Sequence, residues 1–284
     1  MKNFIKQHPL FSYFLVTFIV SWAGIFVVAI FLGMPATSDT FENIGPIALI
    51  PTLLGPPIVG VVFTGLLYGR EGLRSLLAKF LRWKVPVKWY LIALLFVPVT
   101  LCLILFILSR FSPDYYPKIL LQPDKTNFII TGILTGLLGG GLFEEIGWTG
   151  FATPELRKRY GVVKSGLILG FFWGLWHFLP VYWGSGDVNG NLDWSLFLPG
   201  LFCHYTLLVP YRVLLVWLHE KTNSLPPVIL MHASLTAFIL FILNLNEGGL
   251  PLFVYYSCFS LILWALVWLC AKKVRCTHCS SPSQ

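Results

Sequence analysis

The chain has 284 residues, of which 56% are hydrophobic and only 11% are charged, whereas an average soluble domain is about 25% charged. This composition excludes an ordinary soluble protein and indicates a membrane protein. The formal net charge of +8 does not indicate nucleic-acid binding, because the basic residues lie in short segments beside apolar runs, where they would contact anionic lipid headgroups.

Long apolar runs recur along the whole chain. A helix that rises about 1.5 Å per residue needs about 20 residues to cross a hydrocarbon core about 30 Å thick. No segment alternates apolar and polar residues as a barrel strand does. The sequence therefore predicts an all-α polytopic membrane protein, a single domain over residues 1–284, with about eight transmembrane helices: residues 10–33, 46–68, 89–109, 127–147, 165–183, 194–217, 226–244 and 251–271.

The basic residues indicate how these helices are oriented. Lys and Arg are retained on the cytoplasmic side, and most of the 20 basic residues fall in the inner segments if both termini are cytoplasmic. Residues 70–88 resemble a basic amphipathic helix that lies on the inner surface. Residues 272–284 form a polar tail, in which Cys276 and Cys279 have the spacing of a metal-binding pair. Because no second pair accompanies them, we expect a plain polar tail.

A small set of ionisable residues lies inside the predicted helices. Such residues are costly in a bilayer and usually mark function. They are Glu144 and Glu145 in the fourth helix, His177 in the fifth, His204 and Arg212 in the sixth, and His232 in the seventh.

The depth of these residues can be estimated from the helix ends. The two glutamates would lie within about one turn of the cytoplasmic end of the fourth helix, His232 about two turns into the seventh helix, and His177 about three turns into the fifth. Three helices would therefore place carboxylates and imidazoles in the inner half of the membrane.

Glycines suggest which helix faces meet. Every fourth residue from Gly132 to Gly140 is glycine, and Glu144 continues that spacing; a second stripe runs from Gly166 to Gly174, with His177 three residues further on. Repeated G-x-x-x-G allows helix backbones to approach closely in lipid. If both stripes face the same interior, Glu144 and His177 face it too.

Other interpretations of single residues remain open. A glutamate near a helix end can stay hydrated at the interface, and we interpret His204 as a hydrogen-bonded packing residue. Arg212 could extend to the inner interface or act as a counter-ion for the glutamates; its distance from the end of the sixth helix favours the interface.

The combination suits hydrolysis of an amide. A carboxylate buried beside another has a raised proton affinity, which suits a general base acting on water. Imidazoles can hold that water, ligate a divalent metal or stabilise an oxyanion. The H-E-x-x-H pattern of soluble zinc proteases is absent, since His219 and Glu220 begin it without a second histidine.

Three segments resemble a known family in order and spacing: EEIGWTGFATPELRKRYG, GFFWGLWHFLP and WLHEKTNSLPPVILMHAS. They resemble the signature regions of the CAAX-protease and bacteriocin-processing family of intramembrane proteases, which includes the type II CAAX prenyl endopeptidases. The likeness covers residues 126–245. It implies a bundle of about eight helices, the plasma membrane of a prokaryote, and an activity that removes the last three residues from a prenylated, membrane-anchored substrate.

The resemblance also implies roles for individual residues. Glu144 would activate water with Glu145 as its partner, His177 would hold the water or a metal, and His232 would act in the same site or its oxyanion hole. Trp173, in the second segment, is a secondary candidate. The family resemblance leaves open one divalent metal, zinc, held by Glu144, His177 and His232, as well as a metal-free glutamate mechanism.

Two positions depart from the family pattern. The usual first motif, E-E-x-x-x-R, has Thr149 in place of arginine, and the asparagine that usually follows the histidine of the third motif is Thr236. We hypothesise that Arg212 supplies the missing charge; the hypothesis fails if Arg212→Gln leaves activity intact while Glu144→Ala abolishes it.

An intramembrane endopeptidase that opens to the cytoplasm is thus the leading interpretation, with the lipid bilayer and an anchored peptide as partners and no nucleic acid. Two alternatives remain. A non-catalytic family member could act in bacteriocin immunity or as a membrane scaffold. A proton-coupled transporter could use the glutamates and histidines as a relay, although the broken helices and internal repeats common in transporters are not seen.

Overall fold

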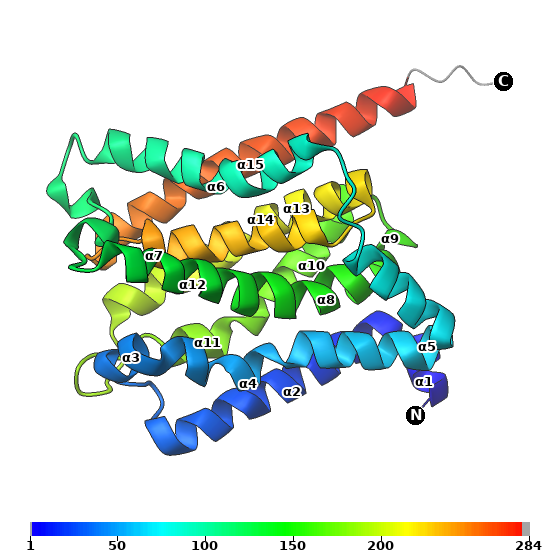
Figure 1. Ribbon diagram of the computed structural model, residues 1–284, viewed down its shortest axis with the longest axis horizontal. Coiled ribbons are helices and arrows are strands. Elements are labelled where there is room, and N and C mark those ends of the chain that lie inside the picture. Colours follow the sequence, from blue (N-terminus) through cyan, green and yellow to red (C-terminus); the bar gives the residue numbers. More distant parts are fainter. Residues whose placement is uncertain (1, 280–284) are drawn as a thin grey trace.

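A computed structural model describes residues 2–279, which form helices and no strand (Figure 1). The predicted all-α fold is confirmed. The helices are α1 (Lys2–Gln7), α2 (Pro9–Leu32), α3 (Ser38–Ala48), α4 (Ile50–Leu53), α5 (Gly55–Phe80), α6 (Val87–Leu108), η1 (Pro113–Tyr115), η2 (Lys118–Leu121), α7 (Lys125–Thr135), η3 (Gly136–Glu144), α8 (Glu145–Gly147), η4 (Trp148–Ala152), α9 (Thr153–Arg157), α10 (Val162–Trp176), α11 (Phe178–Trp183), α12 (Trp194–Thr206), α13 (Leu208–Thr222), α14 (Pro226–Thr236), η5 (Ala237–Ile242) and α15 (Gly249–Cys279).

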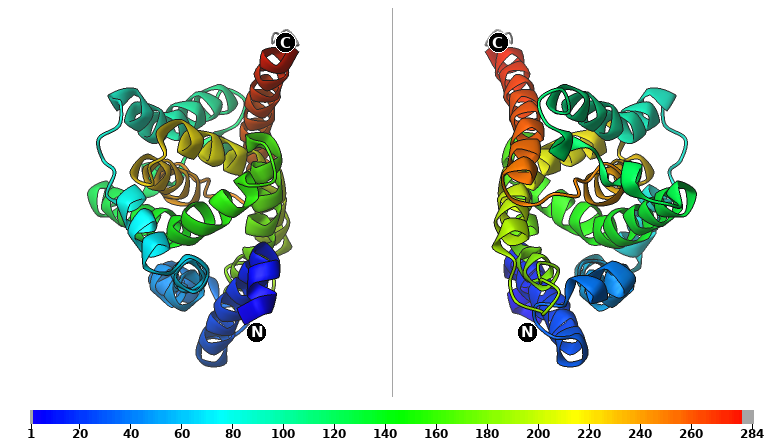
Figure 2. Two further views of the ribbon diagram at one scale, coloured as in Figure 1. Left: turned by 90° about the vertical axis from the view of Figure 1, so that its right-hand side faces the viewer. Right: turned by 90° about the vertical axis from the view of Figure 1, so that its left-hand side faces the viewer.

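Among the described residues, seven helical stretches are long and apolar enough to cross a membrane. The remaining predicted span, the seventh, over residues 226–244, corresponds to the shorter apolar stretch Pro226–Ile242. Figure 2 looks along the bundle from both ends and shows this stretch inside the ring of other helices. Nearly every residue of α14 is buried accordingly. Helices α1 and α15 reach the same end of the bundle, at the right of Figure 1.

The second predicted span and the predicted surface helix are joined within α5. Gly69 interrupts this helix with φ 60° and ψ −151°, a backbone conformation that residues with a side chain rarely adopt. The helix resumes at Arg70 but ends at Phe80, and residues 81–86 are not helical. The predicted helix over 70–88 is therefore shorter than expected, because Pro86 caps the next helix, α6.

The fourth span continues well beyond its predicted end at residue 147. Helical structure runs without a break from Lys125 to Arg157 and includes two π-helical segments, η3 and η4. Glu144 therefore lies roughly 20 Å before the end of this run, not within one turn of it. Hydropathy missed the extension because Trp148–Ala152 is buried against protein instead of lipid. Wider π-helical turns often occur at functional sites.

The two glycine stripes have different partners. A Cβ atom added at Gly136 would meet the backbone of Ala233 and Ala237, so the first stripe packs against α14 and η5. A Cβ atom at Gly166 or Gly170 would meet the backbone of α13 instead. The two stripes thus pack against different helices, and each allows the close helix contact that the pattern predicts.

Two glycines of the fourth span allow a matched test of this packing. A Cβ atom at Gly136 would lie 2.9 Å from the Ala237 backbone nitrogen, which cannot move away, whereas one at Gly139 would have only side-chain neighbours at 3.5 Å or more. We expect Gly136→Ala to lower the free energy of unfolding by about 1–3 kcal/mol and Gly139→Ala to leave it nearly unchanged. Unfolding in detergent measures both; equal stability of the two variants would contradict the packing.

Candidate active site

Glu145 lies at the centre of a fully buried hydrogen-bond network. Arg212 Nη1 donates to its Oε1 at 2.8 Å and to its Oε2 at 2.9 Å. His232 Nδ1 lies 2.6 Å from Oε1, and the Thr149 hydroxyl donates to Oε2. The side chains of Glu145 and Arg212 are both 0% exposed. Because all of these groups bind the same carboxylate, Glu145 is held in place and has little capacity to bind a reacting water.

The favoured prediction for Arg212, that its side chain extends to the inner interface, is wrong. Its guanidinium pairs with Glu145 and lies over the Trp173 ring, 3.9 Å from the ring centroid. The side chain turns inward because Glu145 is deep in the bundle, where an unpaired carboxylate would be costly. The alternative interpretation, a counter-ion for the glutamates, agrees with this geometry.

Glu144 has one oxygen bound and one oxygen available. The indoles of Trp173 and Trp148 donate to its Oε2 at 2.6 and 3.1 Å. Its Oε1 faces His177 Nε2 at 4.0 Å. That separation is too long for a direct hydrogen bond, but a water molecule between the two atoms can span it. Glu144 is thus fixed by its indole donors and presents a free oxygen to His177.

The hydrogen-bond partners of His177 and His232 determine which ring nitrogens are available. His177 Nδ1 lies 2.8 Å from the Trp173 carbonyl oxygen, and His232 Nδ1 faces the Glu145 carboxylate. A carbonyl and a carboxylate only accept hydrogen bonds, so both Nδ1 atoms carry hydrogen. The Nε2 atoms remain for chemistry. His232 Nε2 faces the fourth span, 3.1 Å from where a Cβ of Gly140 would stand.

These four residues come from three segments that are far apart in the sequence. Glu144 and Glu145 lie where η3 meets α8, His177 lies between α10 and α11, and His232 lies in α14. The structure thus brings together Glu144, Glu145, His177 and His232, the four residues predicted for the site.

Comparisons with known proteins agree with this arrangement. Residues 126–238 match the family model described as Type II CAAX prenyl endopeptidase Rce1-like. This region is Rce1-like. The chain is also 24% identical, over 240 residues, to a protein named CAAX prenyl protease 2 from Methanococcus maripaludis. That alignment covers 83% of this chain and 82% of the relative. The predicted resemblance is confirmed, and both matches support a CAAX-protease-like intramembrane endopeptidase.

Both departures from the Rce1-like pattern can be placed in the structure. Thr149 lies one turn after Glu145 and donates its hydroxyl to it, while Arg212 provides the positive charge from α13. Thr236 lies one turn after His232, and its hydroxyl faces Gly140. Trp173, a secondary candidate, contacts more of the site than expected. Its indole binds Glu144, its ring lies under the Arg212 guanidinium, and it meets the His232 ring edge-on.

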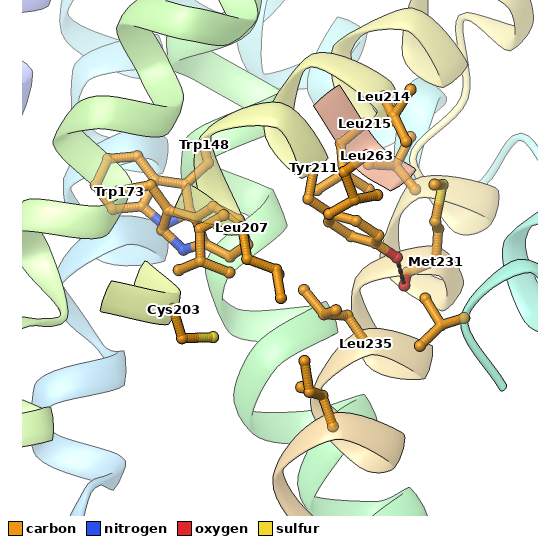
Figure 3. Close-up of a cluster of buried hydrophobic side chains, with 14 of the residues drawn as sticks. Trp148, Trp173, Cys203, Leu207, Tyr211, Leu214, Leu215, Met231, Leu235 and Leu263 are labelled. Atoms are coloured by element: carbon orange, nitrogen blue, oxygen red, sulfur yellow. Dashed lines mark hydrogen bonds between the residues drawn. The ribbon is translucent and has the colours of Figure 1, made fainter. Parts of the chain in front are cut away.

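Three residues near the site were missed or undervalued in the sequence analysis. Trp148 binds Glu144 from one turn further along the same helical run, and that spacing of four could have revealed it. Tyr211, beside Arg212, donates its hydroxyl to the Met231 carbonyl at 2.6 Å and so joins α13 to α14 (Figure 3). The ring of His204, interpreted as a packing residue, lies 4.7 Å from that of His177.

As placed, the donor atoms do not form a cluster that could hold a metal ion. Among the side chains that the structure describes, residues 3–272, no three His, Cys, Asp or Glu groups are arranged to share one. We therefore assign no step to a metal. Side chains beyond residue 272, including Cys276 and Cys279, lie outside those described.

Proposed function

We propose that the chain hydrolyses a peptide bond close to the membrane anchor of its substrate, with Glu144 as the general base that activates water. The observation that carries this proposal is the free Oε1 of Glu144 opposite the Nε2 of His177. A water between them would transfer a proton to Glu144 while its oxygen attacks the scissile carbonyl carbon.

The other residues would support the same reaction. His232, as an imidazolium, would donate from Nε2 to the oxyanion of the tetrahedral intermediate. Glu145 and Arg212 would hold His232 in that orientation. When the C–N bond breaks, Glu144 would return its proton to the leaving amine, so that protons balance over the cycle. No step of this proposal uses zinc.

An apolar groove supports a lipid-anchored substrate. It has a volume of about 270 Å³ and contains only apolar side chains. Ile146, one residue from Glu145, is part of its lining, and the rest of the lining comes from α5 and from Leu225. A prenyl chain in this groove would deliver the adjoining peptide near the carboxylates. We propose that both termini lie in the cytoplasm of a prokaryotic cell, because most of the basic residues then fall on the inner side of the membrane.

The test offers the purified chain a farnesylated CAAX peptide, the same peptide without the lipid, and a peptide library anchored by transmembrane helices. Mass spectrometry would detect the products. We expect release of the C-terminal tripeptide from the farnesylated peptide and much slower cleavage of the unmodified one. No cleavage of any anchored peptide would contradict the proposal and favour a non-catalytic role.

Chelation tests the metal question in the same assay. We expect activity to persist after treatment with a strong zinc chelator, because no step uses a metal. Loss of activity that zinc alone restores would contradict the metal-free form of the proposal.

A further inference from the structure

A row of unpartnered polar side chains runs along α2 toward the site. Among the described residues, six buried side chains in this part of the bundle have a polar atom without a hydrogen-bond partner, and each is at most 4% exposed. They are Ser12, Tyr13, Thr17, Ser21, Thr52 and Trp176.

These hydroxyls differ from others in the same membrane helices. Thr64, Thr100 and Thr206 each donate to the carbonyl four residues earlier, at 2.6 to 2.7 Å. That bond is the usual way to satisfy a hydroxyl in an apolar helix. Ser12, Thr17, Ser21 and Thr52 do not make it. Buried polar groups in native proteins are nearly always satisfied, commonly by ordered water.

The hydroxyls of the row share one face of α2. Tyr13, Thr17 and Ser21 follow each other at intervals of four, which places their side chains on the same side of a helix. The hydroxyls of Tyr13 and Thr17 are neighbours, but they do not meet the geometry of a direct bond.

The row reaches the candidate active site in two places. The Tyr13 ring packs edge-on against Trp148, which binds Glu144, at a centroid distance of 5.6 Å. At the other end, Trp22, next to Ser21, donates to the Trp176 carbonyl at 3.2 Å. The Trp176 ring in turn lies 4.7 Å from His177. Ser12, three residues after the start of α2, is 4% exposed.

We propose that these side chains bind a file of water molecules along α2, which hydrates the Glu144 site and replaces the water that each hydrolysis consumes. The delivery role rests on the proposed function, whereas the hydration of the row does not.

Hydroxyl-radical footprinting in detergent tests the hydration without an activity assay, because radicals formed from bound water oxidise the side chains beside it. Tyr13 and Trp176 report on the row. Tyr255 and Trp183 are matched controls, since they are equally buried and their polar atoms bind the carbonyls of Leu243 and Gly33. We expect oxidation of the two reporters and protection of the two controls. Equal protection of all four would overturn the proposal.

The delivery role is tested with Thr17→Val/Thr52→Val, which removes two hydroxyls without changing side-chain size. The control is Thr100→Val/Thr206→Val, whose hydroxyls bind within their own helices. We expect the first variant to lose labelling at Trp176 and to have a kcat about tenfold lower, with KM unchanged. The control variant should keep both the labelling at Trp176 and the wild-type kcat. An unchanged kcat, or an equal loss in both variants, would overturn the delivery role. A labelled row in a chain without peptidase activity would instead overturn the proposed function and leave the hydration standing.

Discussion

Glu144→Gln is expected to lower kcat by about 10²- to 10⁴-fold, the usual contribution of a positioned general base. Glutamine has nearly the same size, and its amide oxygen can still accept from the indoles of Trp173 and Trp148, which now bind Oε2. Its other terminal atom, an NH₂ group, cannot take a proton from the water that faces His177. The variant should therefore fold and bind substrate normally but fail in the chemical step.

The matched control is Glu155→Gln, on the same helical run. Glu155 is also buried, at 6% exposure, but it binds Tyr68 and Lys158 outside the site. Steady-state kinetics on the farnesylated peptide should show near-normal kcat for this variant. If Glu144→Gln kept more than a tenth of the wild-type kcat, Glu144 would not be the base. If the Glu144→Gln variant kept the biological effect of the wild type, and the wild type cleaved no peptide, a non-catalytic role would be favoured.

The positions of the long membrane helices could be predicted from the sequence because lipid imposes a simple requirement on them. A segment that faces hydrocarbon must be apolar over about 20 residues. The helical run after residue 147 could not be predicted in this way. Trp148, Thr149 and Phe151 contact protein and not lipid, so hydropathy carries no information about them.

That the candidate residues lie close together could be predicted, but their pairing could not. Buried glutamates and histidines stand out in an apolar chain because each is costly there. Which of them pair depends on relative depth and rotation, and the depth of Glu145 was misjudged when the fourth span was expected to end early. The wrong interpretation of Arg212 followed from that error, because a guanidinium near a helix end is usually expected to reach the interface.

The glycine stripes show the same limit. Small residues at every fourth position predict a close helix contact, but they contain no information about the partner. Gly136 faces Ala233 and Ala237, and Gly170 faces Val209, so two similar patterns serve two separate contacts. Only the fold distinguishes them.

Arg212→Gln is expected to lower the free energy of unfolding by about 3–5 kcal/mol, because it leaves the Glu145 charge buried without its partner. The double variant Arg212→Gln/Glu145→Gln should be more stable than Arg212→Gln alone. The double variant no longer buries an unpaired Glu145 charge. Replacing a buried ion pair by uncharged groups often leaves the free energy of unfolding nearly unchanged. The four members of this double-mutant cycle can be compared by unfolding in one detergent.

The control for this cycle is the Arg157–Glu220 pair. Its nitrogen–oxygen distance of 3.0 Å is close to the 2.8 Å of Arg212 and Glu145, but its side chains are 25% and 44% exposed. Solvent screens such a pair, so Glu220→Gln should cost only about 0–1 kcal/mol. Additive losses in the Arg212–Glu145 cycle would show that the two charges are not coupled. Strong coupling together with unchanged peptidase activity in Arg212→Gln would mean that Arg212 stabilises the bundle but does not position His232 for catalysis.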